Sequence, residues 1–184
     1  MKKILVLGGG SFIGGHLISK LKSLHHYVIS VDIKHHKYKK TDANKFIIAD
    51  LRNPIEVDNI IDNSIDEVYQ LAADIGNRAY IDTRYNDSDR IYNSCLINLN
   101  VLKTCSEKNV KKIFYLSSTY VYPEYNQLEP NKSKCSEDKT YPSASDSECG
   151  CEKLFTERLY YVFNKDFPKL DIRVARFHNI YGPR

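Results

Sequence analysis

The sequence predicts an α/β protein with a doubly wound, mainly parallel sheet. Short apolar runs rich in β-branched residues alternate with segments of helical periodicity along the whole chain. The first apolar run ends in a glycine cluster and the second ends in an acidic residue. Because ligands bind at the carboxyl ends of the strands in such sheets, we expect the functional residues to gather there.

The first strand is the apolar run at residues 4–7, and the glycine-rich stretch 8–14 follows it directly. Apolar residues at helical spacing come next, at Ile13, Leu17, Ile18 and Leu21. Glycines let the backbone approach a pyrophosphate, and the helix directs its positive N-terminal end at it, although such clusters also occur in ordinary strand-to-helix turns. This Rossmann-type pattern predicts a dinucleotide phosphate site formed by Gly8, Gly10, Ser11, Phe12, Ile13 and Gly14.

The second strand, at residues 28–32, ends in Asp32, about 20 residues after the glycine stretch, as a dinucleotide-binding fingerprint requires. A carboxylate there accepts hydrogen bonds from the adenosine ribose hydroxyls and repels a 2′-phosphate, which favours NAD over NADP. A lysine cluster just beyond the strand could favour NADP instead, or could be a solvated loop: Lys34, Lys37, Lys39 and Lys40. We predict NAD as the cofactor.

Four more strands are predicted, at residues 46–49, 68–73, 112–116 and 172–177. Helices are predicted from about residue 54, at 89–108 and at 148–164. The polar, proline-punctuated stretch 124–146 is expected to form a long loop. Residues 1–184 therefore form one domain.

Composition excludes several other classes of protein. The net charge of +4 on 184 residues comes from scattered or local lysines, so no nucleic-acid surface is expected. Five scattered cysteines form neither a disulfide framework nor a zinc spacing, and no metal site is predicted. Without a secretory-type leader or an apolar run that could span a bilayer, we expect a cytoplasmic protein that binds no membrane.

Several segments, taken in order, resemble the extended short-chain dehydrogenase/reductases, the NAD-dependent nucleotide-sugar epimerases and dehydratases. These are the glycine turn, Asp32, Asp50-Leu51, Leu71-Ala72-Ala73, Ser117-Ser118, Lys153 and Asn179-Ile180-Tyr181-Gly182-Pro183. Within that family the sequence is most similar to the GDP-mannose 3,5-epimerases, through residues 71–76, 122–125, 152–154 and 176–183. The resemblance extends over residues 1–184.

The resemblance implies a chemistry in which tightly held NAD takes a hydride from a sugar carbon and returns it after acid/base groups have inverted neighbouring carbons. The substrate implied is a nucleotide sugar such as GDP-mannose, and a homodimer is implied through the helices at 89–108 and 148–164. The implied cofactor-binding residues are the glycine turn and Asp32, Asp50, Leu51, Leu71, Ala72, Ala73, Ser117 and Lys153. The implied substrate-binding residues are Gly76, Ser118, Thr119 and Asn179.

Three positions depart from the family pattern. Ser11 replaces a glycine of the turn, where its hydroxyl could donate a hydrogen bond to the pyrophosphate. Cys149 stands where the family has its catalytic Tyr, four residues before Lys153. The Lys153 ammonium and a nicotinamide cation would lower the pKa of this thiol, but a Cys side chain is shorter than that of Tyr. The site is therefore either thiolate-based or degenerate. Tyr120 stands where the epimerases have an acid/base Cys, so Tyr120 either supplies the missing phenol or packs as a loop residue. The catalytic candidates are Ser118, Tyr120, Cys149 and Lys153.

Members of this family continue beyond the point matching Arg184, with a second portion that completes the sugar-nucleotide site. We therefore expect a fragment, a protein whose C-terminal half is a separate chain, or a protein that is impaired alone. The alternatives are a non-catalytic NAD-binding or scaffold protein, and a relative of the nucleotide-sugar 4-epimerases or 4,6-dehydratases.

Overall fold

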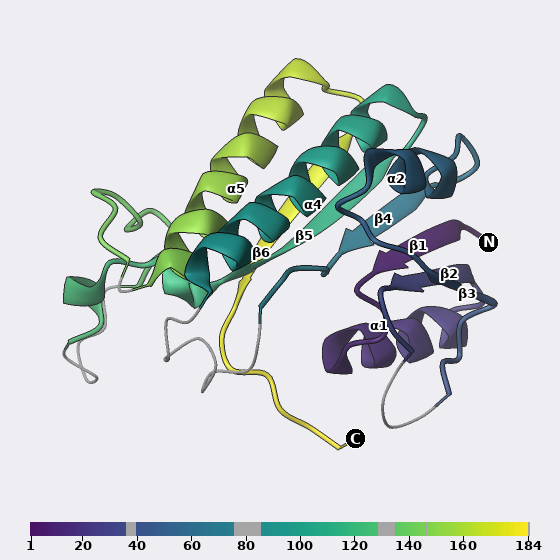
Figure 1. Cartoon of the computed structure of the whole chain (residues 1–184), viewed down its shortest axis with the longest axis horizontal. Coiled ribbons are helices and arrows are strands. Elements are labelled where there is room, and N and C mark those ends of the chain that lie inside the picture. Colours follow the sequence, from purple (N-terminus) through teal and green to yellow (C-terminus); the bar gives the residue numbers. More distant parts are fainter. Residues whose placement is uncertain (36–39, 76–85, 129–134, 146, 184) are drawn as a thin grey trace.

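The computed structural model describes residues 1–35, 40–75, 86–128, 135–145 and 147–183. These residues contain one six-stranded sheet in the order β3-β2-β1-β4-β5-β6, with every neighbouring pair parallel (Figure 1). The strands are β1 (Lys3–Leu7), β2 (Tyr27–Asp32), β3 (Lys45–Ile48), β4 (Glu67–Gln70), β5 (Lys112–Ser118) and β6 (Asp171–Phe177). This strand order is that of dinucleotide-binding doubly wound sheets, so the predicted fold class is confirmed.

Side-chain caps mark where three of the helices begin. Ser11, Asn53 and Ser147 accept hydrogen bonds from backbone N–H groups in the first turn of the helix that follows each of them, and Pro54 occupies the first turn after Asn53. The helices are α1 (Phe12–Ser23), α2 (Pro54–Ile60), α4 (Asp87–Glu107) and α5 (Glu148–Asp166), with short 3₁₀ helices η1 (Thr119–Val121) and η2 (Glu124–Asn126). All the predicted helices are present, with ends shifted by at most two residues.

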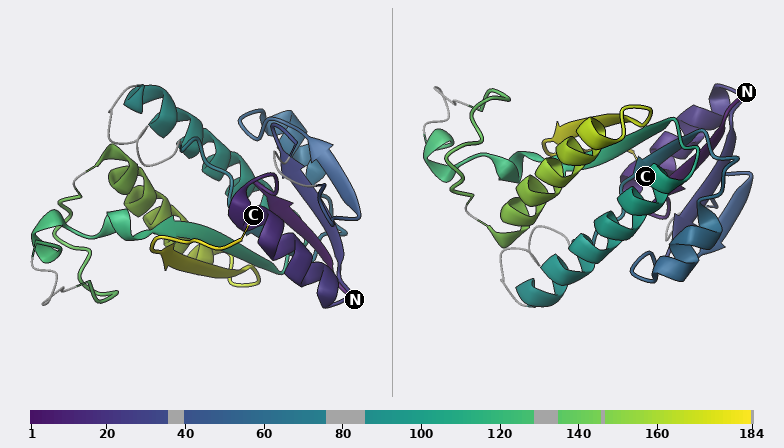
Figure 2. Two further views of the ribbon diagram at one scale, coloured as in Figure 1. Left: turned by 90° about the horizontal axis from the view of Figure 1, so that it is seen from below. Right: turned by 90° about the horizontal axis from the view of Figure 1, so that it is seen from above.

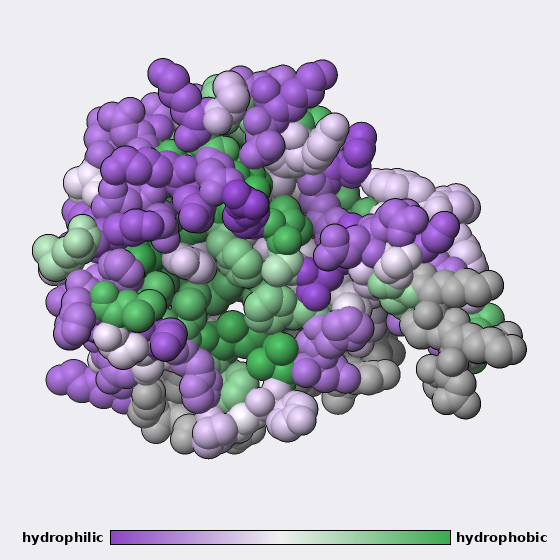
Figure 3. Space-filling view, turned by 180° about the vertical axis from the view of Figure 1, so that it is seen from behind, coloured by the Kyte–Doolittle hydropathy of each residue, from purple (hydrophilic) through white to green (hydrophobic). Residues whose placement is uncertain are grey.

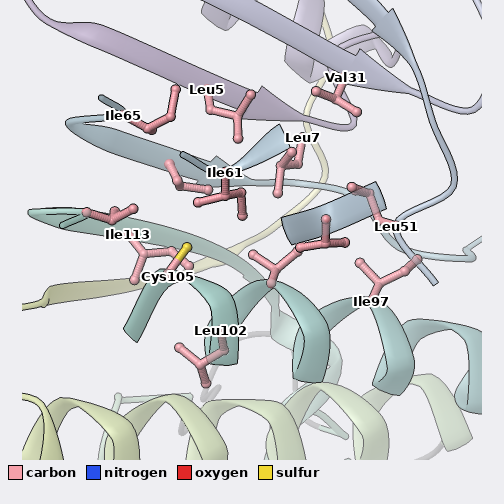
Figure 4. Close-up of a cluster of buried hydrophobic side chains, with 14 of the residues drawn as sticks. Leu5, Leu7, Val31, Leu51, Ile61, Ile65, Ile97, Leu102, Cys105 and Ile113 are labelled. Carbon is pink, nitrogen blue, oxygen red and sulfur yellow. The ribbon is translucent and has the colours of Figure 1, made fainter. Parts of the chain in front are cut away.

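The two faces of the sheet are covered differently. Figure 2 shows α1 on one face and α2, α4 and α5 on the other. Alternate residues of β1 serve the two sides: Ile4 and Val6 pack with Ile18 of α1, whereas Leu5 and Leu7 belong to the larger core on the α4 side. Figure 4 shows that larger core between the sheet and α4.

Two strands differ in length from the prediction at the ends that form the site. The strand predicted at 68–73 ends at Gln70, because the Gln70 side chain exchanges two hydrogen bonds with the backbone of Ala72 and turns the chain out of the ladder. The strand predicted at 112–116 extends to Ser118, which pairs with Phe177 of β6. Among the described residues, no helix is long and apolar enough to cross a membrane.

Candidate functional site

The glycine-rich stretch forms a tight turn between β1 and α1. Gly8 has a φ of +79°, and its N–H and that of Gly9 donate to the carbonyl oxygen of Val31 at 2.8 and 3.1 Å. A Cβ at Gly8 would lie 2.8 Å from the backbone N of Ala72, and one at Gly14 would lie 2.5 Å from the carbonyl oxygen of Gly8. The turn therefore requires glycine at both positions, and its bare backbone at the N-terminus of α1 fits a pyrophosphate.

Ser11 stabilises this turn from within. Its Oγ donates to the carbonyl oxygen of Gly8 at 2.7 Å and accepts from the N–H of Gly14 at 3.1 Å. A hydroxyl has one proton to donate, so in this conformation Ser11 does not offer it to a phosphate. The expected donation from Ser11 to the pyrophosphate is therefore replaced by a structural role.

Asp32 lies beside the turn, at the end of β2. Its Oδ2 accepts the N–H of Gly10 at 2.9 Å and its Oδ1 accepts the N–H of Lys34 at 3.3 Å. These two bonds fix the carboxylate next to the glycine turn, where the sequence spacing placed it. In the predicted lysine cluster, Lys34 lines a cleft that also contains Asp32, and Lys40 is exposed. Lys37 and Lys39 lie outside the described residues.

Asp50, at the end of the next strand, is paired with Arg52. The Arg52 guanidinium donates to both Asp50 oxygens at 2.6–3.0 Å, and this pairing lowers the pKa of the Asp50 carboxyl group. Arg52 Nη1 also donates to Oδ1 of Asn93 at 3.2 Å, and Asn93 Nδ2 donates to Oδ2 of Asp74 at 2.7 Å. This chain of polar contacts joins two walls of the cleft.

Sequence reasoning missed Arg52, Asn93 and Asp74. The arginine two residues after Asp50 was a local signal that could have been used. No local signal existed for Asn93, which reaches the site from a helix 41 residues farther along the chain.

The cleft has a volume of about 320 Å³ and follows the carboxyl ends of β1 to β4. Most of the predicted cofactor residues line it: Gly8, Gly10, Ser11, Asp32, Asp50, Leu51, Leu71, Ala72 and Ala73. The predicted residues Phe12, Ile13 and Gly14 form the first turn of α1, and Gly76 lies outside the described residues. The fit of this cleft to a dinucleotide rests on the glycine turn, because the close backbone contacts at Gly8 and Gly14 exclude side chains there and leave bare backbone beside the cleft.

Ser117 does not belong to the cleft. Its side chain is buried, and Oγ donates to Oε1 of Glu157 at 2.6 Å. Glu157 also accepts from Nε and Nη2 of Arg176 at 2.9 and 2.7 Å. The Ser117 hydroxyl thus joins β5 to α5 and β6.

The residues after Ser117 lie against the N-terminal turn of α5. Ser118 Oγ accepts the N–H of Tyr120 at 3.2 Å and caps η1, which begins at Thr119. A Cβ at Gly150 would lie 2.2 Å from the carbonyl oxygen of Tyr120, so the two backbones are in direct contact. Ser118, Thr119 and Tyr120 are therefore brought close to the turn of α5 that carries Cys149.

Lys153 lies one helical turn after Cys149 and is 5% exposed. Its Nζ donates to the carbonyl oxygen of Leu116 at 3.0 Å and lies 4.9 Å from the centre of the Tyr115 ring. Burial lowers the pKa of the Lys153 ammonium, and nearby acidic groups oppose this shift. The Lys153 side chain thus reaches from α5 to Leu116, near the carboxyl end of β5.

The pKa of the Cys149 thiol is raised. Burial is the largest cause; the Lys153 ammonium acts in the opposite direction but is the smaller effect, and Glu152 adds to the rise. The Lys153 ammonium thus acts on this thiol in the expected direction, but burial outweighs it.

Lys153→Met is expected to stabilise the protein at neutral pH, because it removes a buried ammonium. The folded-state pKa of Lys153 lies below the ordinary value of 10.5, so between these two values the unfolded chain binds more protons than the folded chain. The stability of the wild type should therefore rise, relative to Lys153→Met, as the pH rises through that window.

Urea unfolding of both proteins at a series of pH values up to about 10 measures this difference. Lys153→Arg, which keeps a charge that does not titrate in this range, is the matched control and should show no such gain relative to Lys153→Met. A difference between wild type and Lys153→Met that is constant with pH would contradict the account.

Asn179 lies in the exposed segment after β6 and is not among the residues that line the cleft. This segment returns to α1, where the carbonyl oxygen of Pro183 lies 2.9 Å from Nε2 of His16. It borders an apolar hollow between α1 and the open face of β4, β5 and β6, seen from behind in Figure 3, whose lining includes Phe12, Ile13, Tyr69, Leu71, Phe114 and Phe177. The segment that carries Asn179 therefore lies along this apolar hollow rather than along the cleft.

Comparison with known proteins agrees with this geometry. The NAD dependent epimerase/dehydratase family matches residues 4–184. The chain is 40% identical to GDP-mannose 3,5-epimerase 1 of Oryza sativa subsp. indica and 37% identical to GDP-mannose 3,5-epimerase of Arabidopsis thaliana, over 98% of this chain and 47% and 48% of those proteins. The chain therefore spans about half the length of the curated relatives it matches.

Solved structures give the same fold. UDP-glucose 4-epimerase from Thermotoga maritima aligns with a TM-score of 0.80 and 23% identity, over 99% of this chain and 57% of that one. UDP-glucose 4-epimerase from Thermus thermophilus, solved in complex with NAD, aligns with the same TM-score of 0.80 and 23% identity, over 99% of this chain and 57% of that one. On the family match over nearly its whole length, the chain belongs to the NAD-dependent epimerase/dehydratase family.

Proposed function

We propose that this chain binds NAD, with the adenosine half in the cleft and the nicotinamide end toward Lys153. The observation that supports this most is the glycine turn, which tolerates no Cβ at Gly8 and is joined to Asp32 through the N–H of Gly10. The Asp32 carboxylate would accept the ribose hydroxyls, and Asp50 and Leu51 would lie at the adenine side. Leu71, Ala72 and Ala73 would form the wall along which the cofactor lies.

We further propose that the assembled protein is an epimerase of the GDP-mannose 3,5-epimerase type. Its relatives with that name cover 98% of this chain, and the substrate implied is a GDP-mannose-like nucleotide sugar. Bound NAD supplies reversible hydride acceptance. Lys153 would hold the nicotinamide ribose, Ser118 and Thr119 would contact the sugar, and Asn179 would bind substrate from its segment after β6. Because the chain spans about half of these relatives, complete turnover would also need what their other half provides.

Of the two acid/base candidates, we propose Tyr120 rather than Cys149. Burial raises the pKa of the Cys149 thiol, which disfavours the thiolate form that would act as a base. The Tyr120 backbone lies against Gly150, next to Cys149, so its longer side chain starts from the same neighbourhood. We propose that the Tyr120 phenol exchanges the protons that the family Tyr would exchange.

Tyr120→Phe should therefore lower GDP-mannose epimerisation by about 10²-fold or more, the usual contribution of general acid/base catalysis. Cys149→Ser is the matched control, because it replaces one hydrogen-bonding atom on the neighbouring turn, and it should leave turnover within about threefold. The measurement is the exchange of sugar carbon-bound hydrogen with deuterated water. Unchanged turnover in Tyr120→Phe would exclude the phenol.

A second candidate function is a non-catalytic NAD-binding protein, and the raised pKa of Cys149 is the observation that favours it. The two functions separate in a simple assay. NAD binding without hydrogen exchange in GDP-mannose or dTDP-glucose, and without inversion of UDP-glucose at C4, would support the binding protein. Inversion of UDP-glucose at C4 would support a 4-epimerase relative, and hydrogen exchange in dTDP-glucose would support a 4,6-dehydratase relative.

We also propose that the chain forms a homodimer through α4 and α5, which lie side by side in Figure 1. Large apolar side chains are exposed on both helices: Tyr92 and Leu99 on α4, and Phe155, Tyr161 and Val162 on α5. Light scattering should give twice the chain mass of 21.3 kDa for the wild type.

Phe155→Glu should convert the dimer to a monomer, because it introduces a charge into the apolar surface. Leu24→Glu changes an exposed apolar side chain at the end of α1 and should leave the dimer intact. A monomeric wild type at micromolar concentration would contradict the proposed interface.

A further inference from the structure

We propose that Gln70 and Asn98 are positioning residues for NAD binding, which hold the wall of the cleft at the end of β4 against the glycine turn. Neither residue lines the cleft, and neither was expected from the sequence. The inference rests on the proposed NAD site and assigns to it two buried side chains that act through the backbone of Ala72.

The Gln70 side-chain amide forms two hydrogen bonds with the backbone of Ala72. Its Nε2 donates to the Ala72 carbonyl oxygen at 3.0 Å, and its Oε1 accepts the Ala72 N–H at 3.2 Å. The same backbone N of Ala72 is the atom that a Cβ at Gly8 would approach to 2.8 Å. The peptide held by Gln70 is therefore in contact with the glycine turn, so a displacement of Ala72 would change the shape of the phosphate site.

Asn98 of α4 holds Gln70 in place. Its Oδ1 accepts the second hydrogen of Gln70 Nε2 at 3.0 Å, so both Nε2 hydrogens have partners and the amide cannot rotate without losing them. Asn98 itself is anchored by its Nδ2, which donates to the Ser94 carbonyl oxygen at 3.0 Å within the same helix. Gln70 is 1% exposed and Asn98 is 0% exposed, so water does not replace these bonds.

The same asparagine also reaches α5, the helix that carries Lys153. Asn98 Nδ2 lies 3.4 Å from Oε1 of Glu152, and the Tyr160 hydroxyl lies 3.4 Å from Oδ1 of Asn98. Glu152 precedes Lys153 directly in the sequence. Asn98 therefore connects the wall beside the proposed pyrophosphate site to the helix proposed to hold the nicotinamide ribose.

A core of apolar side chains at these positions would give comparable stability, because buried polar groups contribute little net free energy even when they are fully paired. What the amides add is a fixed geometry, since each bond restrains the rotamer of its partner. A single substitution leaves the partner groups unpaired, so we expect the loss of either amide to lower NAD affinity as well as stability.

Gln70→Met tests this directly, because it keeps the shape of the side chain and removes all three hydrogen bonds. We expect the dissociation constant for NAD, measured by calorimetry on the full chain, to rise about tenfold, the effect of one to two lost hydrogen bonds on the bound conformation. Asn98→Leu should cause a similar loss through Gln70. The double variant should lose little more than either single variant, since the two residues act as one unit.

Thr156→Val is the matched control. It removes a buried hydrogen bond of 2.7 Å from Thr156 to Glu152 and leaves the two hydrogen bonds between Gln70 and Ala72 intact. Urea unfolding should show destabilisation comparable to that of Gln70→Met, while its dissociation constant for NAD stays within about twofold of the wild type. A merely structural role for Gln70 would make the two variants indistinguishable in both measurements.

If the wild type binds NAD, and Gln70→Met and Asn98→Leu bind it with the same affinity, this inference is overturned and the proposed function is not. If Gln70→Met does not fold, Asn98→Leu decides the question by the same measurement. A wild type that does not bind NAD would overturn the proposed function and this inference with it, so the two failures are distinguishable.

Discussion

Gly8→Ala is expected to abolish measurable NAD binding and to destabilise the fold by about 2–5 kcal/mol. The left-handed backbone at φ +79° costs a residue with a Cβ about 1–2 kcal/mol, and overpacking adds about 1–3 kcal/mol. The added Cβ would lie 2.8 Å from the backbone N of Ala72, where no flexible side chain can give way. Urea unfolding and calorimetric titration with NAD measure the two effects.

Gly182→Ala is the control for this substitution. A Cβ at Gly182 would lie 3.6 Å from Cζ of Phe12, an ordinary contact distance, and Gly182 does not require a left-handed backbone. The free energy of unfolding of Gly182→Ala should differ from that of the wild type by less than about 1 kcal/mol. NAD affinity in Gly8→Ala close to that of the wild type would show that this turn is not the phosphate site.

Glu157→Ala should cost about 3–5 kcal/mol of unfolding free energy, because it leaves the Arg176 guanidinium largely buried without its carboxylate. The side chains of Arg176 and Glu157 are 18% and 11% exposed, and the two atoms of their closest contact, Nη2 and Oε2, are 2.7 Å apart. The same substitution removes the acceptor of the Ser117 hydroxyl. Chemical denaturation at neutral pH measures the loss.

Glu107→Ala provides the comparison, because Glu107 pairs with Lys103 at 3.9 Å on the exposed surface of α4. Exposed pairs contribute about 0–1 kcal/mol, so this variant should unfold close to the wild type. Equal effects of the two substitutions would mean that the Ser117–Glu157–Arg176 network does not hold β5, α5 and β6 together.

The cofactor end of the site was predictable because its requirements are local in sequence. Gly8 and Gly14 are needed by the backbone of one turn, and Asp32 ends the strand beside it, so the spacing alone indicated both. The parallel sheet followed from apolar runs that are buried on both faces, as β1 is.

The rest of the site depends on contacts between distant segments. Asn93 and Asn98 reach the strand ends from α4, and nothing in their neighbourhood in the sequence distinguishes them from other helical polar residues. The pKa of Cys149 followed burial rather than the nearby Lys153, and Cys149 is half-buried beside residues of α4, among them Asp87 and Arg90. The hydrogen bond of Ser117 could not be predicted because its partner Glu157 lies 40 residues away.

Calorimetric titration of the full chain with NAD and, separately, with NADP tests directly whether the cleft is an NAD site. We expect one NAD bound for each chain and binding of NADP that is weaker by about tenfold or more, because the carboxylate beside the glycine turn repels a 2′-phosphate. Asp32→Ala should lose this preference. Absence of NAD binding, or equal affinity of the wild type for the two cofactors, would contradict it.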